Sequence, residues 1–163
     1  MALRDLLLAE YDHEVASAAR LLERLPDDRL AWKPHAKSMT LGGLGTHLAH
    51  VPTWTHTILG QPGFDMADLP ADRLELTSRD AILALFAEST AKARAALDQT
   101  DAQYMAPWTL KRDAREVFTV PSVIAFRSFV LNHLIHHRGQ LSVYLRLIDV
   151  PVPAIYGPSA DEG

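Results

Sequence analysis

The chain has 163 residues, 48% of them hydrophobic and 22% charged, with a net charge of −4. These values indicate one soluble globular domain over residues 1–163, and the dispersed lysines and arginines argue against a nucleic-acid partner. The sequence has no cysteine, which excludes disulfides, thiolate metal ligands and a cysteine nucleophile. It shows no apolar run of membrane-spanning length and no secretory signal, so we expect a cytoplasmic protein without a membrane partner.

Hydrophobic periodicity predicts four helical segments. In chain order they cover residues 3–25, 41–59, 78–97 and 120–148. Pro52 should kink or split the second segment, because proline lacks the N–H that would bond to the preceding turn. The connectors 26–40 and 60–77 are long for bundle turns, so at least one should cross over the bundle. Residues 101–120 allow a short extended piece, but we predict no sheet there. The pattern is typical of an all-α four-helix bundle.

The fourth segment contains the most informative motif, NHLIHHRGQ. Its spacing of four residues places His133 and His137 one above the other on a single helix face. Two neutral imidazoles held in this way can bind one divalent metal ion. Helical projection places both within the apolar stripe, where their burial costs free energy unless each finds a partner. The alternatives to a metal site are a hydrogen-bonded polar cluster and a pair that lines an open cleft.

Neighbouring residues are assigned by the same projection. Gln140 and Tyr144 continue the face of the two histidines, whereas His136 is rotated toward its boundary and Arg138 is expected on the outer face. Trp54, on the second segment, and Tyr144 are candidates for the wall of a pocket, as is Gln140. For the two aromatic residues, packing in the core or at its rim is the alternative interpretation.

The second segment adds a third candidate ligand. His47 falls within its inward stripe, while His50 lies at the edge and His56 points away. Three neutral nitrogen ligands would suit zinc, nickel, iron or cobalt, and would not suit magnesium or calcium, which prefer oxygen. Three protein ligands also leave coordination positions open for water or substrate, as in catalytic sites.

Glu14 interrupts the apolar stripe of the first segment. A buried carboxylate needs a partner, and Glu14 could accept a hydrogen bond from the distal nitrogen of a metal-ligating histidine, as outer-shell carboxylates do. The alternative is a slightly different register that brings its carboxylate to solvent.

Longer motifs resemble a known family. The segment SMTLGGLGTHLA (38–49), followed by Trp54, resembles the histidine-bearing second helix of the DinB-like family of metal-dependent proteins. The segment HLIHHRGQL (133–141) resembles the last-helix signature of that family, and the tail VPAIYGPSADE (152–162) is typical of many members.

The resemblance implies a four-helix bundle with up-down-down-up topology and a homodimer. It also implies a divalent metal, most often nickel or zinc, held by His47, His133 and His137. Relatives include thiol S-transferases and YfiT-like proteins interpreted as hydrolases. The leading hypothesis is therefore a metal-dependent enzyme that joins an external low-molecular-weight thiol to a small-molecule substrate. The alternatives are a hydrolase with metal-activated water, for which Glu14 would be a candidate base, and a non-catalytic stress protein that binds metal or a small molecule.

Overall fold

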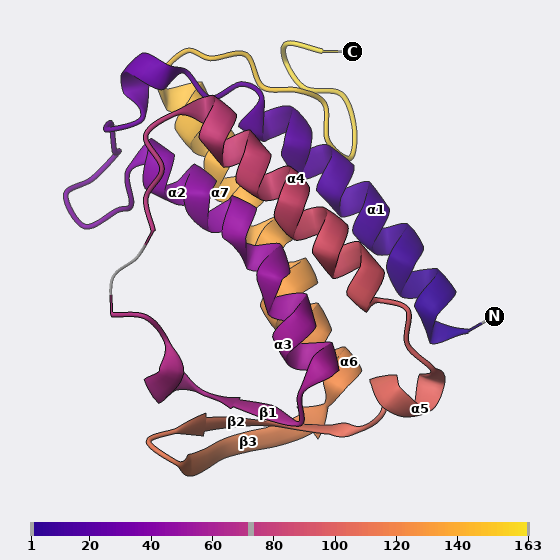
Figure 1. The fold of residues 1–163 in the computed structure, drawn as a ribbon. Coiled ribbons are helices and arrows are strands. Elements are labelled where there is room, and N and C mark those ends of the chain that lie inside the picture. The colour runs from indigo at the N-terminus through magenta and orange to yellow at the C-terminus, as the bar shows by residue number, and fades with distance from the viewer. Residues whose placement is uncertain (1, 72–73, 163) are drawn as a thin grey trace.

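The computed structural model describes residues 2–71 and 74–162. Long helices lie side by side, and a small sheet lies at one end of them (Figure 1). The helices are α1 (Leu3–Leu22), α2 (Leu41–His50), α3 (Trp54–Gly60), α4 (Arg79–Ala96), α5 (Asp101–Tyr104), α6 (Ser122–Phe126) and α7 (Asn132–Leu147). The strands are β1 (Gly63–Asp65), β2 (Pro107–Arg112) and β3 (Arg115–Pro121). Residues 1, 72, 73 and 163 of the predicted domain (1–163) lie outside this description. Two of them, residues 72 and 73, belong to the predicted connector 60–77.

The core lies between four of the helices. α1 packs against α4 and α7, and α2 packs against the same two helices. Apolar stripes at helical spacing fill the space between them, with Leu7, Tyr11, Ala18, Leu21, Leu22, Leu44, Leu48, Ile82, Phe86, Ala93, Leu134, Leu141 and Leu145 all buried. Complete burial of such a leucine, isoleucine or phenylalanine stabilises the fold by about 1.5–3 kcal/mol. This packing fixes α2 and α7 as neighbours.

The predicted interruption at Pro52 is confirmed. α2 ends at His50, a 3₁₀ turn covers Val51–Thr53, and α3 begins at Trp54. Close packing holds α2 in place as well, because a Cβ atom added at Gly45 would lie 2.9 Å from the Leu25 Cδ1 atom. The middle of α2 therefore packs closely against the segment that follows α1.

The predicted fourth segment is not one continuous α-helix. Its first residues belong to β3, and a π-helical turn (Arg127–Leu131) separates α6 from α7. In this turn the Asn132 N–H donates to the Arg127 carbonyl, five residues back, so the turn holds more residues than an α-helical one. The buried face of α7 consequently falls one residue later than projection indicates, on Leu134, Arg138, Leu141 and Leu145. The prediction that Arg138 lies on the outer face is wrong.

The fold is mostly helical, as predicted, but the prediction that residues 101–120 form no sheet is wrong, because a small sheet has the order β1-β2-β3. β1 pairs with β2 in parallel, and β2 pairs with β3 in antiparallel orientation. At the hairpin turn, Asp113 and Ala114 have φ angles of 51° and 62°. The Asp65 carboxylate accepts hydrogen bonds from both of their backbone N–H groups, at 3.0 and 2.6 Å. A distant side chain thus supports a turn that lacks the usual glycine.

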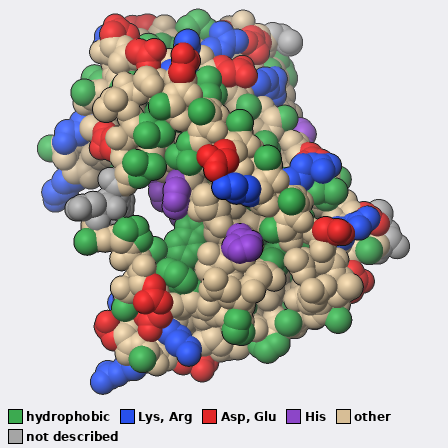
Figure 2. Space-filling view, viewed as in Figure 1, with side chains coloured by type: hydrophobic (Ala, Val, Ile, Leu, Met, Phe, Trp, Pro, Cys, Tyr) green, Lys and Arg blue, Asp and Glu red, His purple; other side chains and the backbone are tan. Residues whose placement is uncertain are grey.

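Positive and negative side chains are interspersed over the face shown in Figure 2, and histidine side chains reach that surface. Among the residues that the structure describes, no helix combines the length and apolar character needed to cross a membrane.

Candidate metal centre

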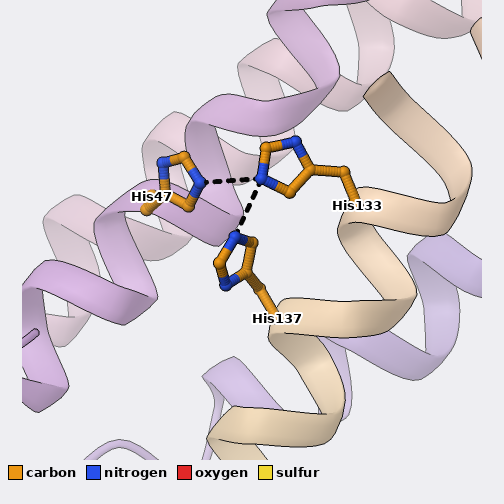
Figure 3. A group of neighbouring side chains, drawn as sticks. All are labelled: His47, His133 and His137. Atoms are coloured by element: carbon orange, nitrogen blue, oxygen red, sulfur yellow. Dashed lines mark hydrogen bonds between the residues drawn. The ribbon is translucent and has the colours of Figure 1, made fainter. Parts of the chain in front are cut away.

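Three histidine side chains converge between α2 and α7 (Figure 3). The Nε2 atom of His133 lies 3.1 Å from that of His47 and 2.8 Å from that of His137. One nitrogen from each ring lies within 4.8 Å of the other two, and all three residues are half-buried. The sequence prediction therefore selected residues that the fold brings together, although they lie at the edge of the core and not inside it.

Each ring is placed by the helix that carries it. His133 and His137 are one turn apart on α7, directly after the π-helical turn, and their ring centroids are 4.6 Å apart. His47 stands in the last turn of α2, and its ring lies nearly perpendicular to that of His137, with centroids 4.5 Å apart. Because α2 and α7 pack directly against each other, the convergence rests on rigid elements of the fold. His50, His56 and His136 are exposed and lie outside this group.

The outer nitrogens of the α7 pair have hydrogen-bond partners of their own. His137 Nδ1 lies 2.7 Å from Gln140 Oε1, so an Nδ1–H group would donate to that amide oxygen. His133 hydrogen-bonds with the Phe129 backbone, one turn earlier. Burial lowers the pKa of both histidines, and these two hydrogen bonds only partly oppose it. Both rings are therefore biased toward the neutral form, which is the form that binds metal.

This arrangement fits a shared cation. When His133 and His137 each donate from Nδ1, the neutral rings have no proton on Nε2, and two lone pairs face each other across 2.8 Å. A metal ion accepts lone pairs from every ring at once, at about 2.0–2.1 Å from each nitrogen. Ligand nitrogens around one such ion lie about 3 Å apart or slightly more, close to the 2.8 and 3.1 Å separations seen here.

A family comparison places the whole chain. The model of the DinB family matches residues 2–163. The chain belongs to the DinB family. A 34-residue segment is also 47% identical to the uncharacterized protein YrdA of Bacillus subtilis (strain 168), and this match spans 21% of the chain and 20% of YrdA.

Solved structures of DinB-like proteins share the fold. One, from Bacillus cereus ATCC 10987, aligns with a TM-score of 0.71 at 22% identity and covers 91% of this chain and 95% of its own. Another, YjoA from Bacillus subtilis, aligns with a TM-score of 0.68 at 19% identity and covers 90% and 96%. At these identities the likeness establishes a DinB-like fold and leaves the activity open.

The predicted pocket residues are placed differently from one another in this DinB fold. Gln140 contacts the histidine cluster directly. Tyr144 packs edge-on against Trp32, with ring centroids 5.8 Å apart, and Trp54 packs edge-on against Phe64 at 5.0 Å. A hollow of about 550 Å³ lies beside the sheet, lined by residues of 61–68 and 109–114 and not by the histidines. The candidate site is therefore identified by its three converging histidine nitrogens and not by this hollow.

Glu14 is buried, as one interpretation of the sequence required, with only 5% of its surface exposed. One carboxylate oxygen accepts a hydrogen bond from Arg138 Nη1, and both oxygens lie 2.8 Å from the Tyr156 hydroxyl. The Arg138 guanidinium also lies over the Tyr156 ring, 4.8 Å from its centroid. This Glu14–Arg138–Tyr156 cluster joins α1, α7 and the C-terminal tail, and these hydrogen bonds of Glu14 do not involve the histidine cluster.

Sequence reasoning missed the partners of Glu14. Arg138 follows Leu134 by four residues and precedes Leu141 by three, a spacing that would have placed it on a buried helix face. For Tyr156 the indication in the sequence was weaker, because its hydrogen-bond partner Glu14 lies more than a hundred positions away in the chain. No periodicity links positions so far apart.

Proposed function

We propose that this DinB-family protein binds one divalent transition metal through the Nε2 atoms of His47, His133 and His137. Nickel and zinc suit three imidazole ligands best, with iron and cobalt as alternatives. The convergence of these nitrogens, with outer nitrogens of His133 and His137 that already have hydrogen-bond partners, is the observation that supports the proposal. Outer partners of this kind fix the ring orientation and the tautomer of metal-ligating histidines.

We further propose the up-down-down-up order of the four long helices and a homodimeric assembly, as the family resemblance implies. In Figure 1, α1 and α7 run in one sense, and α2 and α4 run in the other, which supports this order. A sedimentation measurement of the purified protein tests the assembly, and a monomer at every accessible concentration would contradict it.

The activity that we propose joins the sulfur of an external low-molecular-weight thiol to a small electrophilic substrate. A bound metal would stabilise the reactive thiolate in an open coordination position. The chain contributes three neutral nitrogen ligands on rigid helices, and their half-buried position leaves access for a small molecule. Because the chain contains no cysteine, the sulfur nucleophile has to come from outside.

Hydrolysis by metal-activated water remains the second candidate, together with a non-catalytic binding role. In the hydrolytic case Glu14 is a poor choice of base, since Arg138 and Tyr156 already occupy its carboxylate. A hydrolase would have to use another group to accept the proton, and it would turn over without added thiol.

Elemental analysis of purified protein tests the metal site first. Wild type should contain close to one equivalent of nickel, zinc, iron or cobalt, or should take it up after reconstitution. Metal affinity should fall by at least about 100-fold in each of the variants His47→Ala, His133→Ala and His137→Ala. This is the upper end of the loss that removal of an outer-shell partner causes, and removal of a ligand should cost no less. His50→Ala and His56→Ala remove exposed histidines outside the cluster and are matched controls that should bind normally. Equal metal binding by all five variants would contradict the site.

The thiol reaction is tested in the metal-loaded protein. Bacillithiol, mycothiol and glutathione would each be supplied with an electrophilic substrate, before and after removal of the metal. We expect thiol-dependent turnover that disappears with the metal. Turnover without thiol would favour the hydrolase, and metal binding without any turnover would favour the non-catalytic role.

A further inference from the structure

Gln140 contacts the candidate ligand His137 from outside the histidine cluster. It stands three residues after His137 on α7, so the helix itself brings its amide to the outer edge of the imidazole ring. Its Oε1 atom lies 2.7 Å from His137 Nδ1. An amide oxygen can only accept, so the contact requires a proton on Nδ1.

The opposite tautomer has a competing partner. If the proton of His137 moved to Nε2, that N–H could donate to His133 Nε2, only 2.8 Å away. The two rings would then close on each other through an N–H···N hydrogen bond, and His137 would lose the lone pair that points into the cluster. The acceptor at Nδ1 therefore decides whether the inner nitrogen is available to a cation.

We propose that Gln140 is a positioning residue that holds His137 in the tautomer whose Nε2 lone pair faces His47 and His133, and thereby sets the metal affinity of the site. This inference rests on the proposed metal-binding function.

The outer partners of His133 and His137 differ in an important way. His133 is held by the backbone of Phe129, which a side-chain substitution does not remove. His137 is held by a side chain that is exposed and can be replaced without opening the core. Gln140 is thus the position at which the acceptor can be changed while the ligands stay in place, and Gln140→Glu should keep the acceptor whereas Gln140→Leu should remove it.

The test compares these two variants with wild type and with Asn132→Leu. Asn132 is an exposed amide side chain on the same helix, so its replacement by leucine is a matched control for the loss of a surface amide. Affinity for Zn²⁺ and Ni²⁺ would be measured by competition with a chromophoric chelator. We expect Gln140→Leu to weaken metal binding by about 10–100-fold. The dissociation constants of Gln140→Glu and Asn132→Leu should stay within about threefold of the wild-type value.

A second readout uses the metal-free protein and is independent of metal binding. Long-range ¹H–¹⁵N correlation spectra report which ring nitrogen of His137 carries the proton. We expect Nδ1–H in wild type and in Gln140→Glu, and a shift toward Nε2–H in Gln140→Leu. An unchanged tautomer together with unchanged affinity in Gln140→Leu would overturn the inference while leaving the metal site intact. Failure of wild type to bind any metal would instead overturn the proposed function, and the spectra would still decide the tautomer.

Discussion

Two faces of α7 hold polar side chains, and the two faces differ in how those groups are satisfied. On the face toward α1, Arg138 is buried to 2% exposure and pairs with Glu14, whose carboxylate also meets the Tyr156 hydroxyl. On the face toward α2, His133 and His137 are half-buried and direct their Nε2 atoms at each other. The first group is closed by a counter-charge and a hydroxyl from the chain itself, whereas the second brings the Nε2 atoms of two histidine rings to 2.8 Å from each other.

The difference separates a structural polar cluster from a binding one. A buried charge is tolerated when its counter-charge and hydrogen bonds lie within the protein, and the Glu14–Arg138–Tyr156 cluster meets this condition. In the proposed function, a metal cation would be the partner that the Nε2 atoms of the histidine cluster share. We therefore expect substitutions on the first face to change stability, and substitutions on the second to change metal binding.

The largest effect is expected on the α1 side. Arg138→Met removes the positive charge and leaves the Glu14 carboxylate buried without its main partner. Loss of one member of a buried ion pair costs about 3–5 kcal/mol. The free energy of unfolding, measured by denaturant titration of the metal-free protein, should fall by this amount.

A double variant separates pairing from simple loss of packing. Glu14→Leu combined with Arg138→Met replaces the pair by apolar side chains, a change that is often neutral or stabilising in other buried pairs. Most of the lost stability should therefore return. A double variant as unstable as Arg138→Met alone would contradict the view that an unpaired carboxylate causes the loss.

The next effect belongs to the α2 side and depends on metal. At a free metal concentration about 100 times the dissociation constant, wild type should gain about 2.7 kcal/mol in the free energy of unfolding. His137→Ala should gain little under the same conditions, because one of its three proposed ligands is missing. Thermal or denaturant unfolding with and without Zn²⁺ measures both values. An equal gain in the two proteins would locate the bound metal elsewhere.

Local patterns in the sequence were sufficient for much of this picture. The long helices follow from their apolar periodicity, and the break at Pro52 follows from a missing N–H. The i, i+4 spacing of His133 and His137, with His47 on an inward stripe, was enough to select the group that the fold assembles. Each of these features depends on residues within a few helical turns of one another.

Other features depend on partners that are distant in the chain. The sheet was missed because β1 is parallel to β2, a pairing between segments more than forty residues apart, and because the turn at Asp113 is supported by Asp65 and not by a local glycine. The burial of Arg138 was missed because the π-helical turn changes the phase of the helix that follows. The spacing of Leu134, Leu141 and Leu145 does record the new phase, but a projection that runs one straight helix through residues 120–148 overlooks it.

A smaller effect is expected for the tail. Tyr156→Phe keeps the ring that packs against the Arg138 guanidinium but removes the hydroxyl hydrogen bond to Glu14. The Tyr156 side chain is largely exposed, at 65%, so water can replace part of this bond, and we expect a loss of about 1 kcal/mol in the free energy of unfolding. Metal affinity should stay unchanged, since the tail closes the α1 side. A variant with wild-type stability but weaker metal binding would reverse this assignment of the two faces.

The free energy of unfolding of the metal-free protein should depend on pH through the histidines on the α2 side of α7. Burial lowers the pKa of His133 and His137 from the ordinary value of 6.5 in the folded state, despite the opposing bonds to Phe129 and Gln140. The unfolded chain therefore takes up protons at these positions before the folded protein does. The free energy of unfolding should fall as the pH drops through 6.5, and this contribution should level off below the folded pKa values.

Denaturant titrations in the presence of a chelator, from about pH 8 to about pH 5, measure this slope. A His133→Asn/His137→Asn double variant should lose the part of the slope that these two rings contribute, whereas Tyr156→Phe should keep it. If the double variant retained the full wild-type slope, the two imidazoles would not be held neutral by their surroundings. Each ring would then take up its proton around the ordinary value of 6.5, as an exposed imidazole does, and its surroundings would add no preference for the neutral form that binds metal.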